Sequence, residues 1–477
     1  MRRAKNTALS THYIKIKYYL CNENTAVGSC LGDIYAYAHD GVTGVRYRAI
    51  YRLTNYVTDY TIMTFRFLLS FSLLLLAMTA KAEKFDFTKP MAAYDDAAGY
   101  GFDVVDAPVL NGRKAQAKPF YFSVKVPDGN YRVTVTLGSK RHAAETSVRA
   151  ESRRMMVEKC VTRKGQTETF SFVVHKRTPD IDGSKKVRIK PGEVGSMTWD
   201  DKLTLEFNGA APAVQSVVIE PDTAAVTLFL CGNSTVVDQG REPWASWGQM
   251  FPRWFDTNVC VANYGESGLT ASSFMAQNRL DKVLAMMKKG DYVFCEFGHN
   301  DEKEKGPGTG AWYHYTVALK KFVDRVREKG GNIIFCTPTQ RRFFEKDGTL
   351  RNTHGEFPDA MRAVAQREQV PLIDLNAETK TLFETMGAEG SKHLLVHYPL
   401  GSFPWQDKAF ADNTHFNPFG AYEVSKLVVM GLKSISSPLV SFLRADWQDF
   451  SPSHPDDWQT FYWPQSPLYD GRKPDGN

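Results

Sequence analysis

The stretch TLFLCGNST, residues 227–235, decides the fold, because a short apolar run ends abruptly there at small and polar residues. A run of this length bounded by Gly and Asn is typical of a strand buried on both faces. Four more runs of this kind follow along the chain, at residues 259–263, 292–297, 333–337 and 371–375. They predict five strands of one sheet.

Helical periodicity fills the segments between these strands. The predicted helices lie near residues 247–255, 274–288, 315–329, 358–368 and 418–432. Strands that alternate with helices predict an α/β domain in which helices cover both faces of a parallel sheet. Ligands of such sheets bind at the carboxyl ends of the strands. The residues that follow each strand are therefore the candidate site.

The region before this domain, residues 83–222, has the patterning of strands. Segments 120–126 and 131–137 alternate apolar and polar residues about the turn 127–130 (PDGN), which predicts a hairpin. Shorter strand-like segments follow at residues 167–174, 203–207 and 217–219. This pattern predicts an all-β sandwich.

A short connection at residues 221–224 separates the predicted sandwich from the α/β domain, which we assign to residues 223–436. The tail, residues 437–477, is rich in Pro and Trp and has no regular period. We expect it to form an extended strap packed on the α/β domain. Its tryptophans are alternatively sugar-stacking residues, although aromatic side chains outside a site usually only pack.

Residues 63–82 read as a secretory signal peptide. Arg66 precedes the apolar run 67–78, and Ala80-Lys81-Ala82 forms an Ala-x-Ala cleavage site before Glu83. A membrane anchor is the alternative, but a run of about a dozen residues is short of the roughly 20 that span a bilayer. We therefore expect a secreted or periplasmic protein without stable membrane insertion, and we expect residues 1–62 to be a non-native extension from an upstream start codon.

The composition, with 43% hydrophobic and 23% charged residues among 477, excludes a disordered or fibrous protein. The net charge of +6 comes entirely from residues 1–82, which hold 10 Lys and Arg against 4 Asp and Glu. The remainder is neutral, with 49 of each sign. A neutral body argues against nucleic acid as a partner.

The cysteines and histidines give no metal pattern. Five cysteines follow Glu83, an odd number whose spacing matches no zinc motif and indicates structural thiols. The side chains of His299, Asp301, Asp412 and His415 could be imagined as ligands, but no HExxH-like spacing supports them. We predict no metal and no cofactor.

Small and polar residues follow the first three predicted strands of the sheet. They form the blocks 232–235 (GNST), 265–268 (GESG) and 298–301 (GHND). Near the C-terminus, Asp412 and His415 stand three apart in a predicted loop. Asn417 and Pro418 follow as the expected N-cap and first residue of the last helix.

These blocks contain the groups that acyl transfer needs. Ser234 is a candidate nucleophile, His415 a candidate base, and Asp412 the carboxylate that would orient the base. The backbone N–H groups of Ser234 and Gly268 and the side-chain amide of Asn300 are candidate oxyanion donors. Each residue alone could be a cap, a turn or a loop residue. Their conjunction after successive strands favours an enzyme.

In this order the blocks resemble those of the SGNH (GDSL-type) hydrolase superfamily, over about residues 226–432. The phrases 247–249 (WGQ) and 296–301 (EFGHND) are similar to those of rhamnogalacturonan acetylesterases. The resemblance implies a flavodoxin-like sheet and a Ser234, His415 and Asp412 triad, with Ser234, Gly268 and Asn300 forming the oxyanion hole. One departure is Asn233, which stands where the family usually has Asp.

The resemblance implies a secreted serine esterase that removes O-acetyl groups from a plant polysaccharide, most simply pectic rhamnogalacturonan. A surface groove lined by His299, Trp312 or Trp405 would hold the polymer. The sandwich resembles galactose-binding-like domains. Two alternatives stay open: an acetylesterase for another glycan, such as xylan or sialic acid, and a noncatalytic carbohydrate-binding protein.

Overall fold

The computed structural model describes residues 14–15, 35–36, 82–105, 118–468 and 473–475. Of the predicted signal peptide, only Ala82 lies within these residues. Of the predicted extension, residues 1–62, only two short strands do. Those strands, β1 (Ile14–Lys15) and β2 (Tyr35–Ala36), pair antiparallel in a unit that ends at Ala80. Lys81–Asn477 form a second compact unit, which holds every feature described below.

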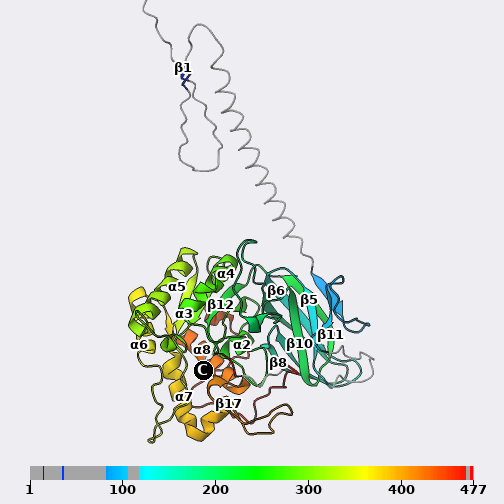
Figure 1. Ribbon diagram of the computed structural model, residues 1–477. Helices are drawn as coiled ribbons and strands as arrows, with labels where there is room; N and C mark the ends of the chain where they lie inside the picture. Colours follow the sequence, from blue (N-terminus) through cyan, green and yellow to red (C-terminus); the bar gives the residue numbers. More distant parts are fainter. Residues whose placement is uncertain (1–13, 16–34, 37–81, 106–117, 469–472, 476–477) are drawn as a thin grey trace, which may run out of the picture. The chain divides into compact units, whose positions relative to one another are not determined.

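The N-terminal part of this second unit is a sandwich of antiparallel strands, as predicted (Figure 1). One layer contains β4 (Tyr100–Asp103), β5 (Phe120–Lys125), β10 (Lys202–Ala211), β7 (Ala144–Ala150) and β8 (Arg154–Thr162), in that order. The other contains β9 (Thr167–Lys176), β6 (Gly129–Gly138), β11 (Val214–Pro221) and β3 (Glu83–Asp86). Phenylalanines of both layers fill the space between them, including Phe85, Phe120 and Phe172.

The predicted hairpin between β5 and β6 is wrong. β5 pairs with β4 and β10, whereas β6 pairs with β9 and β11 in the opposite layer. At this turn the chain crosses from one layer to the other, and Asp128 in the turn is held by residues far along the chain. Its carboxylate accepts hydrogen bonds from Thr178 N (2.8 Å) and from Lys282 Nζ (2.6 Å).

The α/β part contains the predicted parallel sheet. Its order is β16 (Leu372–Ile373), β15 (Asn332–Cys336), β14 (Tyr292–Glu296), β12 (Val226–Gly232) and β13 (Val259–Asn263). Each strand runs parallel to its neighbours, and in the centre Cys231 of β12 lies opposite Cys295 of β14. The strand ends that carry the candidate blocks therefore meet at one edge.

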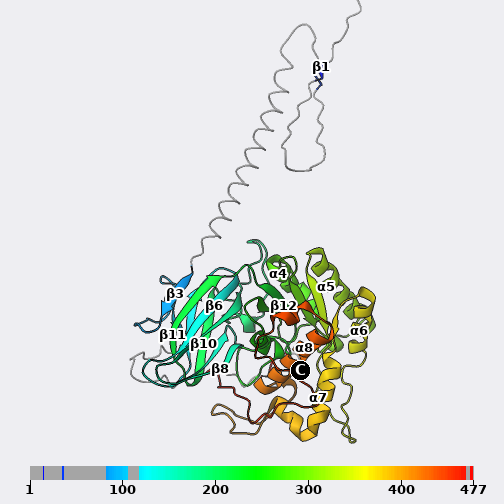
Figure 2. The ribbon, with the colours of Figure 1, turned by 180° about the vertical axis from the view of Figure 1, so that it is seen from behind.

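Helices cover both faces of this sheet, as Figures 1 and 2 show from opposite sides. One face packs on α2 (Trp247–Met250), η2 (Phe251–Trp254), α7 (Leu375–Gly390) and α8 (Pro418–Ser434). The other packs on α3 (Ala271–Ala276), α4 (Arg279–Met286), α5 (Thr316–Glu328) and α6 (Phe357–Glu368). The shorter helices are η1 (Pro191–Glu193), η3 (Asp301–Lys303), η4 (Ala311–Tyr315), η5 (Ser391–Leu394) and η6 (Pro438–Phe442). The sequence did not predict α7.

The two parts share one sheet. β13 pairs in parallel with β9 of the sandwich through Val261 and Val174, so nine strands form a continuous sheet from β16 to β3. A division by architecture at residue 222 stays a prediction. The structure groups both architectures into one compact unit.

The five cysteines in the described part of this unit are free and buried. Four of them lie in neighbouring strands of the parallel sheet: Cys231, Cys260, Cys295 and Cys336. Burial raises the pKa of each of these four thiols. Among the described residues, no helix is long and apolar enough to cross a bilayer.

Candidate active site

Asp412 and His415 lie in a strand, not in the predicted loop. The strand β18 (Phe410–Phe416) pairs antiparallel with β17 (Leu395–Tyr398), and an irregularity between Leu395 and His397 shifts the register. The predicted helix start is confirmed. The side chain of Asn417 accepts a hydrogen bond from Gly420 N (2.9 Å), and Pro418 begins α8. The strand therefore leads directly into a capped helix.

Ser234, His415 and Asp412 form one hydrogen-bonded chain. Oγ of Ser234 lies 2.9 Å from Nε2 of His415. Nδ1 of the same ring lies 2.8 Å from Oδ2 of Asp412. The three residues are at most 5% exposed. A hydroxyl, an imidazole and a carboxylate at these distances have the geometry of a serine nucleophile activated by a histidine base, with the carboxylate orienting the base.

The carboxylate of Asp412 is fixed on both oxygens. Oδ1 accepts from the backbone N–H groups of Thr414 (2.9 Å) and His415 (3.1 Å). Oδ2, besides meeting the imidazole, lies 3.5 Å from the indole nitrogen of Trp244. Burial alone would raise the pKa of Asp412, but His415 and these backbone donors hold it well below its usual range. The carboxylate is thus ionised and oriented.

The other two blocks come together beside the end of β12. Glu266 N donates to Gly232 O (3.1 Å), which ties the loop that follows β13 to the end of β12. Gly268 in that loop has a φ of 74°, a conformation that favours glycine. Asn300, which is buried, donates from Nδ2 to the carbonyl of Leu269 (3.1 Å). An amide carries two N–H groups, and this bond uses one of them.

Asn233 retains the hydrogen bonds of the turn before Ser234. Its Oδ1 accepts from Thr235 N (3.1 Å) and from Thr235 Oγ1 (3.0 Å). Behind it lies Glu296, whose carboxyl contacts Thr235 Oγ1 (2.7 Å) and the indole nitrogen of Trp247 (2.5 Å). Burial raises the pKa of Glu296 to about 7. The amide oxygen of Asn233 therefore makes the hydrogen bonds of this turn without a charged carboxylate at that position.

Residues 230–421 match the GDSL-like Lipase/Acylhydrolase family. The rhamnogalacturonan acetylesterase RhgT of Bacillus subtilis (strain 168) is 40% identical over 220 residues, which cover 46% of this chain and 94% of that protein. This chain belongs to the GDSL-like lipase/acylhydrolase family. It is accordingly a hydrolase of ester bonds, built on the mixed α/β sheet described above.

Two other relatives of this GDSL-like hydrolase come from the same bacterium. The probable rhamnogalacturonan acetylesterase YesY is 29% identical and covers 44% of this chain and 94% of itself. The uncharacterized esterase YxiM is 27% identical over 359 residues, which are 71% of this chain and 85% of that protein. The aligned region is longer than the α/β part and the tail together, so the similarity to YxiM extends into the sandwich.

The three residues predicted to line a groove lie in different settings. His299 is buried, and its Nε2 lies 3.3 Å from Thr339 Oγ1, while its Nδ1 has no hydrogen-bond partner among the residues that the structure describes. Trp312 in η4 is 48% exposed. Trp405 packs on Phe403, with ring centroids 5.0 Å apart. A role for any of them in substrate binding stays a prediction.

The sequence did not predict the loop of residues 238–244, which touches the triad at two points. Gln239 donates from Nε2 to the carbonyl of Ser234 (3.0 Å), and Trp244 lies against Asp412. The sandwich supports this loop from behind. Nη1 of Arg153 donates to the carbonyls of Gln239 (3.0 Å) and Trp244 (2.8 Å), and Nε of Arg154 donates to Asp238 (2.6 Å).

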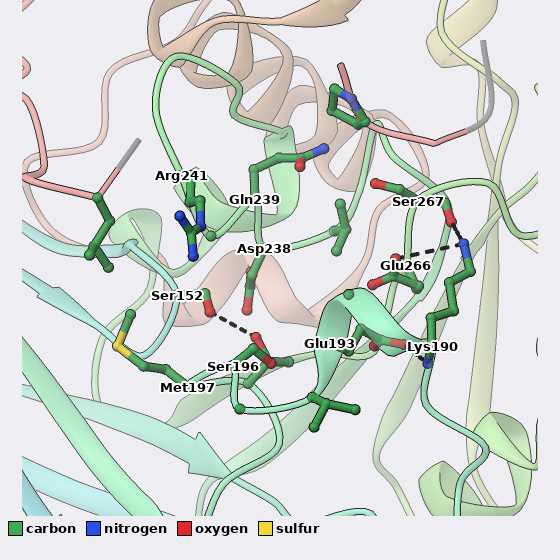
Figure 3. A pocket seen from close by; sticks show the side chains of 18 of the residues that line it. Ser152, Lys190, Glu193, Ser196, Met197, Asp238, Gln239, Arg241, Glu266 and Ser267 are labelled. Atoms are coloured by element: carbon green, nitrogen blue, oxygen red, sulfur yellow. Dashed lines mark hydrogen bonds and ion pairs between the residues drawn. The ribbon is translucent and has the colours of Figure 1, made fainter. Parts of the chain in front are cut away.

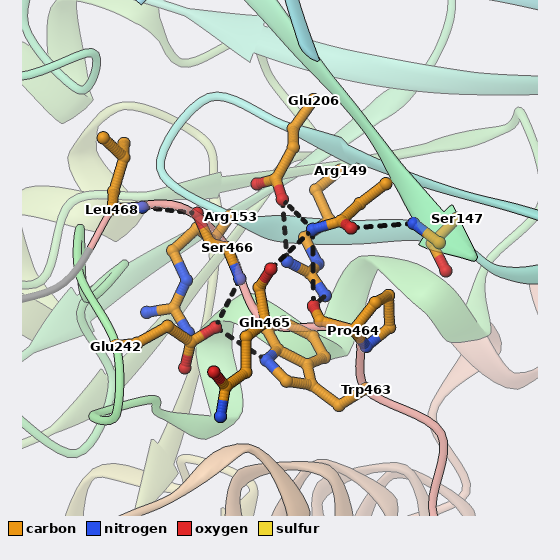
Figure 4. A network of polar contacts seen from close by, with 12 residues as sticks. Ser147, Arg149, Arg153, Glu206, Glu242, Trp463, Pro464, Gln465, Ser466 and Leu468 are labelled. Carbon is orange, nitrogen blue, oxygen red and sulfur yellow. Dashed lines mark hydrogen bonds and ion pairs between the residues drawn. The ribbon is translucent and has the colours of Figure 1, made fainter. Parts of the chain in front are cut away.

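The tail binds the sandwich as well as the α/β part. Trp463 stacks its ring 3.5 Å from the guanidinium of Arg149, a buried sandwich residue paired with Glu206 (2.9 Å). The indole nitrogen of Trp463 donates to Glu242 (2.8 Å), which also pairs with Arg153 (2.7 Å). Figure 4 shows this network. The predicted strap therefore connects the supporting arginines of the sandwich to the loop beside the site.

The four side chains imagined as metal ligands do not form such a cluster in the described part of the chain. Among the residues that the structure describes, no group of three or more His, Cys, Asp or Glu side chains could hold a metal ion. Asp301, one of the imagined ligands, instead accepts hydrogen bonds from the backbone N–H groups of Ala271 (2.9 Å) and Gly298 (2.9 Å). Its carboxylate fixes the blocks after β13 and β14 against each other.

Proposed function

We propose that this hydrolase removes O-acetyl groups from an acetylated plant polysaccharide, most simply pectic rhamnogalacturonan, through an acetyl-enzyme on Ser234. The observation that carries the proposal is the continuous chain from Ser234 Oγ through His415 to Asp412, at 2.9 and 2.8 Å. The name of the relative RhgT supports the substrate, since that protein is a rhamnogalacturonan acetylesterase.

The first half-reaction uses His415 as a base. Ser234 Oγ attacks the acetyl carbonyl carbon while its proton moves to His415 Nε2, and Asp412 stabilises the resulting imidazolium. The carbonyl oxygen becomes an oxyanion. The backbone N–H groups of Ser234 and Gly268 and the second N–H of Asn300 are the donors that we assign to it. Nε2 then returns the proton to the sugar oxygen, which leaves as a hydroxyl.

The second half-reaction repeats these steps with water. His415 accepts a proton from the water that attacks the acetyl-enzyme, and the same donors hold the second oxyanion. The proton then returns to Ser234 Oγ, and acetate leaves. No cofactor takes part in these steps.

The test is acetate release from a panel of acetylated substrates: rhamnogalacturonan, xylan and 4-nitrophenyl acetate. We expect the wild type to act on all three and to favour rhamnogalacturonan in kcat/KM. Ser234→Ala should lower kcat by several orders of magnitude with almost unchanged thermal stability, because the hydroxyl acts in the chemistry. Equal kcat/KM on both polymers would contradict the pectin substrate. A Ser234→Ala enzyme with more than about a tenth of wild-type activity would exclude Ser234 as the nucleophile.

We also propose that the protein is exported, on the pattern of residues 63–82. Protein recovered from the periplasm or medium should begin at Glu83 by N-terminal sequencing. Exported, folded protein that begins at Met1 would contradict this.

A further inference from the structure

A cavity of about 680 Å³ lies beside the triad, between the sandwich and the α/β part (Figure 3). Trp244 and Gln239, which touch Asp412 and Ser234, line it on one side, together with Ser267 next to Gly268. The segment 192–198 of the sandwich lines the other side. The cavity is thus larger than an acetyl group requires and is built by two regions far apart in the sequence.

Lys190 of the sandwich reaches across this cavity to the oxyanion loop. Its ammonium donates to the carbonyl of Ser267 and lies 3.8 Å from Glu266, as Figure 3 shows. It lies only 3.2 Å from the position that a Cβ on Gly268 would occupy. Lys190 also lies outside residues 230–421, which match the family. A cation from the sandwich is therefore placed directly against a family glycine.

A carboxylate of the tail pairs with the ammonium of Lys190. The carboxylate of Asp475 lies 3.3 Å from Lys190 Nζ, and the Cβ of Asp475 lies 3.1 Å from the same position beside Gly268. Asp475 is exposed to solvent, with 74% of its side chain accessible. A carboxylate can thus reach Lys190 from the solvent side, beside the site of acyl transfer.

Most of the other acidic side chains around the cavity are neutralised. Three have a cation of their own: Asp103 with Lys202, Glu193 with Arg279, and Asp238 with Arg154. Burial, with the neighbouring Glu193, raises the pKa of Glu266. Burial raises the pKa of Asp200 only to about 6, so Asp200 stays largely ionised at neutral pH, near Lys202. Among the cations of the lining, Lys473 lies 3.6 Å from Oδ1 of Asp412, and Lys190 faces Asp475. Lys190 can therefore pair with another carboxylate once Asp475 leaves.

We infer that Lys190 binds the carboxylate of an acidic sugar in the acetylated polysaccharide, and that Asp475 occupies this place in the absence of substrate. The inference rests on the proposed function. Galacturonate, the uronic acid of a galacturonan, carries such a carboxylate, and xylose carries none. Because Lys190 lies against Gly268, the bound carboxylate belongs to the acetylated sugar or to its immediate neighbour. The sandwich then contributes a specificity-determining residue.

The test compares Lys190→Met with the wild type on acetylated rhamnogalacturonan oligosaccharides, acetylated xylan oligosaccharides and 4-nitrophenyl acetate. We expect KM for the acidic substrate to rise about tenfold, which corresponds to the loss of one charge-assisted hydrogen bond. Losing the contact of Lys190 with Ser267 can lower activity on the two neutral substrates, but by the same factor for both and by less than on the acidic substrate. Added NaCl should raise the acidic-substrate KM of the wild type and change that of Lys190→Met little.

Three further variants complete the design. Lys190→Arg should restore most of the affinity for the acidic substrate, because it keeps the charge. Lys164→Met, which removes an exposed lysine of a sandwich turn, should behave as wild type on all substrates. Asp475→Asn should lower KM for the acidic substrate, because the competing carboxylate is gone.

An unchanged acidic-substrate KM in Lys190→Met would overturn the inference. So would an equal loss on all three substrates, which would place Lys190 in the chemistry or in the fold. A wild type that cleaves only the neutral substrates would also overturn it and leave the esterase intact. Failure of the wild type on 4-nitrophenyl acetate as well would instead contradict the proposed function.

Discussion

The Asp412 carboxylate serves the backbone with one oxygen and the imidazole with the other, so an amide in its place separates the two roles. In Asp412→Asn, Oδ1 can still accept from Thr414 N and His415 N. Nδ2 would face His415 Nδ1, which must then accept, so the proton moves to Nε2 and the base can no longer take the hydroxyl proton of Ser234. We expect kcat to fall by about a hundredfold to ten-thousandfold with a nearly unchanged KM.

Steady-state kinetics on 4-nitrophenyl acetate checks this prediction. Asp407→Asn, at an exposed aspartate just before β18, is the matched control and should keep wild-type kcat. A kcat within a few-fold of wild type in Asp412→Asn would remove Asp412 from the triad.

Glu296 predicts how stability depends on pH. Its pKa is about 7 in the fold, against about 4.5 for an ordinary Glu. The folded state therefore binds the proton more tightly than the unfolded state. The folded state loses this advantage as pH rises from about 4.5 through about 7, at a cost of up to about 3 kcal/mol in the free energy of unfolding. The thermal midpoint should fall over this range.

Glu296→Gln should flatten this dependence. The Gln side chain can accept from Trp247 Nε1 and donate to Thr235 Oγ1, which can turn its own proton to Asn233. Thermal melts between pH 5 and pH 8 compare the wild type, Glu296→Gln and the exposed control Glu328→Gln. The same slope in Glu296→Gln and wild type would assign the pH dependence to other buried carboxyls, such as Asp301, whose pKa burial raises to about 7.

At the scale of elements, the loop 238–244 depends on Arg153. The side chain of Arg153 is fully buried and meets Gln239 O, Trp244 O and Glu242. Lysine in this position keeps the charge next to Glu242. Its single ammonium nitrogen cannot reproduce the hydrogen bonds that the planar guanidinium makes to the two carbonyls and to Glu242 at once. We expect Arg153→Lys to lower kcat on 4-nitrophenyl acetate by about tenfold, since small displacements near a site are costly.

Arg163→Lys, at an exposed arginine in the turn between β8 and β9, is the control and should keep wild-type kcat and thermal midpoint. If Arg153→Lys melts at a lower temperature but keeps its kcat at 25 °C, the arginine supports the fold without positioning the loop.

The sequence predicts elements well where their burial is apolar. The central strands of the parallel sheet read as apolar runs, and their bounds agree with the structure to within about a residue. β7 and β8 were not predicted, because they bury charged side chains. Arg149 in β7 is paired with Glu206, and Arg154 in β8 is paired with Asp238. The pattern of such strands looks polar although their residues lie inside.

Some residues of the candidate site could likewise be predicted from the sequence, and others could not. The triad residues follow from blocks that are local in sequence, and the structure brings all three within hydrogen-bonding distance. Lys190 and Arg153 carry no local signal, because their positions depend on how the sandwich packs against the α/β part. The wrong hairpin has a related cause, since the partners of Asp128 lie 50 and 154 residues away.

For the whole molecule, the shared sheet and the strap predict cooperative unfolding. The nine-stranded sheet and the Arg149, Glu242 and Trp463 network join the sandwich to the α/β part. Separating them would leave buried arginine and glutamate charges without partners, which is strongly destabilising. We expect protein that begins at Glu83 to unfold in a single calorimetric transition, with equal calorimetric and van't Hoff enthalpies. Two resolved transitions would contradict this.

The four buried thiols of the parallel sheet carry a consequence for biogenesis. In the folded protein they are shielded from oxidants, because a thiol that is buried and has a raised pKa forms little thiolate. On the export proposed above, a newly exported chain would pass through an oxidising environment before the sheet closes, with these thiols exposed. Disulfides formed between these thiols before folding would then trap the chain in a non-native state, because the four cysteines are free in the folded protein. Recovery of active protein after denaturation should accordingly increase when a reductant is present during refolding.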